Sequence, residues 1–152
     1  EVPVLSQRAC GSCTACCSVL ETKAAHDPNG PGDKPAGENC RHLTPGGCGV
    51  YAERPAYCKA FRCSWLSGDL KIRPRPDLFG VITTVQKTVL HPMTTVAYEC
   101  WPGAGDLLDV REALFAFSGD RPIWIVNGET GRRTVLNMDQ RKLQRLITEV
   151  RR

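Results

Sequence analysis

The sequence predicts an α+β fold, in which a cysteine-rich, loop-dominated lobe packs beside a small β-β-α-β-β-α layer. Eight of the nine cysteines lie between Cys10 and Cys63, whereas ordinary hydrophobic periodicity begins only at Phe79. We place the change of composition near Ser67. Residues 1–67 then form a cysteine-cluster region and residues 68–152 an α+β region, and we expect the two to pack as one compact domain.

The first region has little regular structure of its own. Short helical turns are predicted at 12–19 and from Arg54-Pro55, where the proline suits the first helical position. Residues 27–37 are rich in glycine and proline and predict a loop. Because large apolar residues are few here, burial alone would not stabilise the region, and cross-linking through a metal would supply what the core lacks.

The second region begins with two strands and a helix. Residues 79–90 and 94–101 are rich in β-branched and aromatic residues on either side of His91-Pro92, which predicts paired strands. Residues 106–117 predict an amphipathic helix. Its apolar stripe consists of Leu107, Val110, Leu114 and Phe117.

Two further strands and a helix complete the layer. Residues 122–126 and 133–136 flank a turn at 127–131 and predict a hairpin. Asn137, with Gln140 three positions on, is predicted to cap a final helix. The expected buried stripe of that helix is Leu143, Leu146, Ile147 and Val150.

The distribution of apolar residues predicts no membrane-spanning segment. No run approaches the roughly 18 apolar residues that cross a bilayer, and residues 1–8 contain no long apolar leader, so a cytoplasmic protein that binds no membrane is expected. The sequence starts at Glu1, which leaves N-terminal trimming open. The net charge of +4 is mild, and 7 of the 20 basic residues lie in 132–152.

The cysteine spacing predicts metal binding instead of disulfides. The total is odd, Cys16 and Cys17 are adjacent, and the first four follow the pattern C-x2-C-x2-C-C. Cys10, Cys13 and Cys16 are close enough in sequence to converge on one centre. The spacing matches the first three ligands of a bacterial ferredoxin run, while sites of four cysteines also suit zinc, so zinc or an iron–sulfur cluster both fit.

The whole cysteine pattern resembles the YkgJ-type cysteine-cluster family, the CxxCxxCC group described as a zinc- or iron-chelating domain. The matching residues are Cys10, Cys13, Cys16, Cys17, Cys40, Leu43, Cys48, Tyr51, Arg54, Pro55, Cys58, Phe61 and Cys63. The resemblance covers about two fifths of the chain and implies metal chelation. The predicted metal ligands are Cys10, Cys13, Cys16, Cys17, Cys40, Cys48, Cys58 and Cys63.

Thiolates around a metal leave negative charge that needs compensation. Arg41, Arg54, Arg62 and Tyr51 lie within or beside the ligand run and are predicted to support the ligands without binding the metal. Phe61 and Trp65 are expected to cover the sulfurs. Cys100, in a predicted strand, is expected to be a small buried hydrophobic residue.

The sequence therefore predicts a metal-binding protein, with metal ions as ligands and a protein partner contacting the α+β half. Beyond the metal cluster no nucleophile–base pair or carboxylate dyad stands out, so no catalytic residue is assigned. One alternative is a redox or methyl-transfer enzyme, or its accessory, that uses an iron–sulfur centre. The other is a nucleic-acid-binding zinc module using the basic C-terminal segment, although a solvated helix face is the favoured interpretation of that segment.

Overall fold

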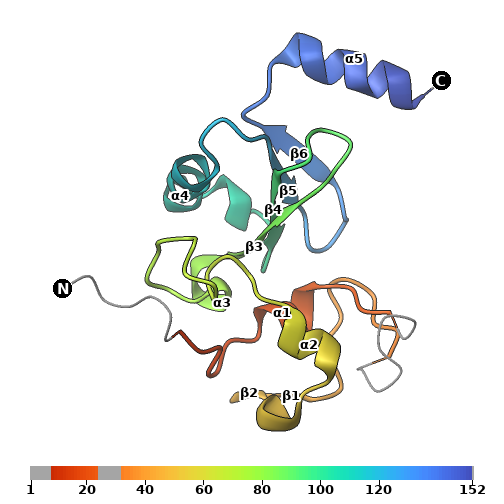
Figure 1. The fold of residues 1–152 in the computed structure, drawn as a ribbon. Helices are drawn as coiled ribbons and strands as arrows, with labels where there is room; N and C mark the ends of the chain where they lie inside the picture. Colours follow the sequence, from red (N-terminus) through yellow and green to blue (C-terminus); the bar gives the residue numbers. More distant parts are fainter. Residues whose placement is uncertain (1–7, 24–31, 152) are drawn as a thin grey trace.

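The computed structural model describes residues 8–23 and 32–151 and has an α+β fold built on a mixed sheet (Figure 1). The elements in chain order are α1 (Ala15–Val19), β1 (Leu43–Thr44), β2 (Gly47–Cys48), η3 (Tyr51–Glu53), α2 (Ala56–Ala60), α3 (Pro76–Phe79), β3 (Val81–Gln86), β4 (Thr94–Glu99), η4 (Ala104–Asp106), α4 (Leu108–Ser118), β5 (Ile123–Val126), β6 (Arg133–Leu136) and α5 (Gln140–Val150).

The main sheet has four strands in the order β3-β4-β5-β6. β3 and β4 are antiparallel, with Ile82 opposite Tyr98, and β5 and β6 are antiparallel as well. β4 and β5 are parallel, and the connection between them contains α4. A parallel pair requires such a crossover, which explains why a helix stands between the two predicted strand pairs.

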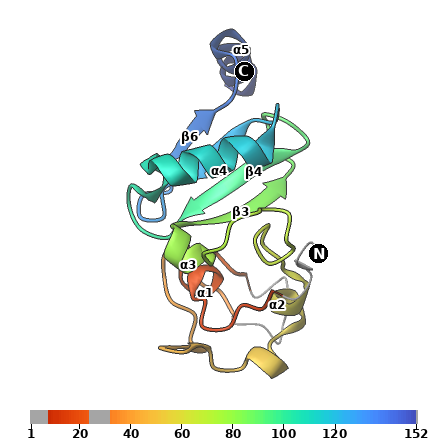
Figure 2. The ribbon, with the colours of Figure 1, turned by 90° about the vertical axis from the view of Figure 1, so that its left-hand side faces the viewer.

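Each face of the sheet supports a separate apolar core. The helix-side core consists of Val81, Ala97, Val110, Leu114, Ile123 and Ile125, and it joins α4 to the sheet. The cysteine-side core consists of Ala15, Val19, Cys63, Trp65, Leu66 and Ile82. Since Val81 and Ile82 are neighbours on one strand, they point to opposite faces. Figure 2 shows α4 crossing the strands, with α1, α2 and α3 gathered beyond one end of the sheet.

The predicted order of strands and helices from Phe79 onward is confirmed, and the differences lie at the ends of elements. Phe79 ends the short helix α3, and β3 begins only at Val81. Val110 and Leu114 are buried as predicted, whereas Leu107 is 47% exposed because it precedes α4 in an extended conformation. Helical spacing identified the correct face but included one residue too many.

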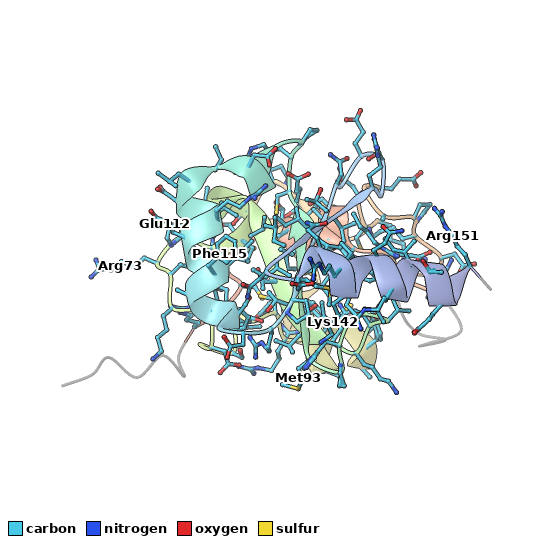
Figure 3. The ribbon with its side chains drawn as sticks, turned by 90° about the horizontal axis from the view of Figure 1, so that it is seen from above. Arg73, Met93, Glu112, Phe115, Lys142 and Arg151 are labelled. Carbon is cyan, nitrogen blue, oxygen red and sulfur yellow. The ribbon has the colours of Figure 1, made fainter. Side chains whose placement is uncertain are left out.

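The predictions for α5 are wrong in two respects. Asp139, not Asn137, caps the helix, and its carboxylate accepts hydrogen bonds from the N–H groups of Arg141 and Lys142. Asn137 has a positive φ and donates its side-chain amide to two carbonyls near the end of α4. None of the residues of α5 is buried. Figure 1 shows α5 beyond the end of the sheet, and Figure 3 shows it pointing away from α4, so its apolar stripe is not buried against the described residues.

The first region contains short elements joined by loops. α1 and α2 lie within the predicted helical turns, and the two-residue strands β1 and β2 form a hairpin that the sequence pattern did not predict. Residues 27–31 of the predicted loop at 27–37 lie outside the described residues. Its described end makes one isolated bridge, between Thr22 and Lys34.

None of the helices in the described part of the chain has the length and apolar character that a bilayer-spanning segment needs.

Replacement of Leu114 by alanine tests the helix-side core. Leu114 is 0% exposed, so we expect Leu114→Ala to lower the free energy of unfolding by about 2–5 kcal/mol. Leu108 belongs to the same helix but is 70% exposed, so Leu108→Ala should change stability by less than about 0.5 kcal/mol. Chemical denaturation followed by circular dichroism measures both, and equal losses would contradict this assignment of the core.

Candidate metal centre

The cysteine side chains of the first region surround one cavity of about 80 Å³. The cysteines that line it are Cys10, Cys13, Cys16, Cys17, Cys40, Cys48, Cys58 and Cys63. These are the eight residues that the sequence predicts as ligands. They come from the turn before α1, from α1 itself, from the β1–β2 hairpin and its preceding loop, and from α2 and the segment that follows it.

Close backbone contacts bring these segments together. The turn at Cys10 is closed by a 2.8 Å bond from the N–H of Cys13 to the carbonyl of Cys10. A Cβ at Gly47 would lie 2.7 Å from the carbonyl oxygen of Gly11, so only glycine lets the β1–β2 hairpin approach this turn. The N–H of Cys40 donates to the carbonyl of Cys17 at 2.7 Å, which ties the segment before β1 to α1.

Helix α3 holds the other side of the first turn. The Arg75 guanidinium bonds to the Ser12 hydroxyl at 2.5 Å and forms an ion pair with Asp77 at 3.1 Å. The thiol of Cys13 lies within hydrogen-bonding reach of the Asp77 carboxylate. The α+β half therefore contributes a charged contact to the wall of the cysteine region.

All nine cysteines are free thiols, so the structure contains no disulfide. As the side chains stand, no three histidine, cysteine, aspartate or glutamate residues among those described form a group that could hold a metal ion. The eight thiols therefore share a cavity without being arranged as a finished coordination shell. A change of χ1 rotamer moves a sulfur while leaving the backbone in place.

Burial opposes the ionisation of several of these thiols. It raises the pKa of Cys13 to about 11, and it also raises the pKa values of Cys58 and Cys63. Cys17 behaves differently from these thiols, because a hydrogen bond from Cys16 stabilises its thiolate and lowers its pKa to about 7, with a further contribution from the charge of Lys34. The same hydrogen bond, together with burial, raises the pKa of Cys16.

Lys34 is a functional candidate that the sequence analysis missed. It is only 6% exposed, and its ammonium donates to the carbonyls of Glu38, at 2.6 Å, and Pro35. It interacts electrostatically with Cys40, Cys17 and Cys16. Burial lowers its pKa, since a desolvated ammonium is costly. Its position in a glycine- and proline-rich stretch gave no signal of burial.

The rest of the wall combines apolar cover with unused hydrogen-bond donors. Phe61 and Trp65 line the cavity, as predicted for residues that cover the sulfurs. The guanidinium of Arg54 stacks on the ring of Tyr51 at 4.1 Å, and both residues also line the cavity. The Nε of Arg54 and the Nε1 of Trp65 are buried and have no hydrogen-bond partner among the described residues.

The remaining predicted residues are placed differently. Arg41 and Arg62 are exposed and do not line the cavity; Arg41 bonds to the ring of His42, and Arg62 bonds weakly to the carbonyl of Leu66. His42 does line the cavity. Cys100, immediately after β4, packs against the cysteine-side core, and its thiol faces the carbonyl of Pro76 at 3.4 Å.

Comparison with known proteins gives no assignment: no family model, curated protein or solved structure matches the chain.

Thiol reactivity in reduced, metal-free protein tests the electrostatics of the cavity. We expect iodoacetamide to modify Cys17 with a midpoint near its pKa of about 7, whereas Cys13, with a pKa of about 11, should stay largely unmodified from about pH 6 to about pH 9. Peptide mass spectrometry measures both residues. Lys34→Met should move the Cys17 midpoint to higher pH, and faster modification of Cys13 than of Cys17 would contradict the assignment.

Proposed function

We propose that this chain is a metal-binding protein whose clustered cysteines hold zinc or an iron–sulfur cluster. The observation that carries the proposal is that eight free thiols, from segments spread over residues 10–63, line one cavity. Core packing alone gives no reason to collect so many thiols in one place. The resemblance of the cysteine pattern to the YkgJ-type family implies the same chemistry.

The donor set fits this chemistry. Thiolates are soft ligands that suit zinc and iron–sulfur clusters. Burial opposes ionisation of thiols such as Cys13 and Cys63 in the metal-free chain, and a bound cation reverses this preference because a coordinated thiol is deprotonated. Binding should therefore release protons and weaken as the pH falls.

The surroundings fit a centre that carries net negative charge. Four thiolates around a divalent ion leave a charge of about −2, which is costly away from water unless it is compensated. Lys34 supplies a buried positive charge beside three of the cysteines. The Nε–H of Arg54 and the Nε1–H of Trp65 have no partner among the described residues, and both could donate hydrogen bonds to sulfur ligands.

The role of the centre depends on the metal. A zinc ion would cross-link the short elements α1, α2 and the β1–β2 hairpin, whereas an iron–sulfur cluster would also supply electron transfer. In both cases the chain's own residues position the sulfurs, and Phe61 and Trp65 limit the access of water to them.

Anaerobic purification followed by metal analysis tests the proposal. We expect zinc in stoichiometric amount in a colourless protein, or iron with acid-labile sulfide and a broad absorption band near ~400 nm. Removal of the metal should unfold the first region, because the binding free energy is part of its folding free energy. A protein that contains no metal after anaerobic purification, and that takes up neither zinc nor iron and sulfide, would refute the proposal.

Neutralisation of Lys34 tests the charge compensation. We expect Lys34→Gln to weaken metal binding by about 10-fold to 100-fold, the usual effect of removing a group that supports the ligands. Lys23 is an exposed lysine whose ammonium pairs with Glu21 at 2.7 Å, so Lys23→Gln is the matched control and should leave affinity unchanged. Competition with a chromophoric chelator measures both affinities, and equal effects would argue against a role for Lys34.

A further inference from the structure

We infer that the cysteines form two separate four-sulfur centres and that Cys100 belongs to one of them. This inference rests on the proposed metal binding. The first centre consists of Cys10, Cys13, Cys63 and Cys100. The second centre consists of Cys17, Cys40, Cys48 and Cys58. Cys16 lies between the two.

The first group is defined by its packing on the cysteine-side core. Cys63 is part of that core, and the side chains of Cys10, Cys13 and Cys100 all pack against it. The Cys100 thiol interacts electrostatically with Cys13 and Cys63, and the Cys63 thiol with Cys10. Cys100 reaches this position because β4 ends at Glu99 and the N–H of Cys100 donates to the carbonyl of Gly80 at 2.8 Å.

The second group is defined by a different cavity. Besides the shared cavity, Cys17, Cys40 and Cys58 line a second space of about 70 Å³, together with Lys34 and Tyr57. Cys48 joins them through a hydrogen bond between its thiol and that of Cys17. The Cys58 thiol interacts electrostatically with the other three members of this group. Neither Cys13 nor Cys63 lines this second cavity.

Cys16 lies between the two groups because it has neighbours in both. It packs against the cysteine-side core, and it also lines the second cavity. Its thiol interacts with Cys17 on one side and with Cys10 and Cys13 on the other. Residues three apart across the start of a helix do not have to serve the same ion, so the C-x2-C-x2-C spacing is compatible with two centres.

The two centres differ in the charges around them. The second has Lys34 close to Cys17 and Cys40. The first faces the carboxylate of Asp77 through Cys13 and rests on apolar side chains. The Asp77 carboxylate is paired with the Arg75 guanidinium at 3.1 Å, so this pair adds no net positive charge to the first centre, whereas Lys34 adds one to the second. We therefore expect the first centre to release its metal to a chelator before the second.

Reconstitution of the full chain with Zn²⁺ alone, under anaerobic conditions, tests this inference. Wild-type protein should bind two ions. Cys100→Ala and Cys58→Ala should each bind one ion, and the double variant should bind none. Two ions retained by Cys100→Ala, or loss of both ions from either single variant, would overturn the division. A wild-type chain that binds no metal would instead refute the proposed function itself.

Protection of individual thiols gives a second readout that does not require each variant to be equally stable. In zinc-loaded Cys100→Ala, alkylation followed by peptide mass spectrometry should modify Cys10 while Cys40 and Cys58 stay protected; Cys13 and Cys63 are not used as reporters, because burial slows their reaction even without metal. Cys58→Ala should show the reverse pattern. Wild-type protein treated with limiting chelator should expose Cys10 before Cys40 and Cys58. Simultaneous exposure of all the thiols would indicate one shared centre and overturn the inference.

Discussion

The packing of the cysteine-bearing segments on Ile82 is the contact on which the rest of the structure depends. Ile82 belongs to β3, yet it lies in one apolar cluster with Ala15, Trp65 and Leu66. The elements of the first region are only two to five residues long, which is too short to be stable alone. One face of the sheet therefore supplies the surface against which α1 and the segment after α2 take their positions, and the cavity follows from those positions.

Much of the α+β region could be predicted because its strands and helix bury regular patterns. Val81 to Val85 are β-branched, and Thr94 to Tyr98 are β-branched or aromatic apart from Ala97. Val110 with Leu114 marks the buried face of α4. The parallel pairing of β4 and β5 was not predicted, since composition does not reveal strand direction. Helix α5 is amphipathic, as its sequence pattern predicts. The pattern cannot show whether another part of the protein packs against its apolar stripe.

Of the candidate centre, only the cysteines between residues 10 and 63 could be predicted. Cysteine spacing identified all eight cysteines that line the cavity, because ordinary core packing does not gather so many thiols in one short stretch of chain. Lys34 and the role proposed above for Cys100 could not be recognised, since Lys34 lies in a stretch typical of loops and Cys100 is an isolated cysteine beside a strand. Both reach the cysteine region through tertiary contacts, with Thr22 and Gly80 respectively. Proximity in sequence to the predicted ligands did not reliably identify the arginines of the site: Arg54 lines the cavity, whereas Arg41 and Arg62 do not.

The contacts of Arg8 bear on the order in which the chain folds. Its guanidinium donates to the carbonyls of Trp65, Leu70 and Ile72, which lie 57 to 64 residues after Arg8 in the sequence. Strands β3 and β4, by contrast, pair across a short connection. Closing a long loop costs more entropy than closing a hairpin, and distant contacts form more slowly. The sheet should therefore assemble early, and the beginning of the chain should close over the cysteine segments as a late event.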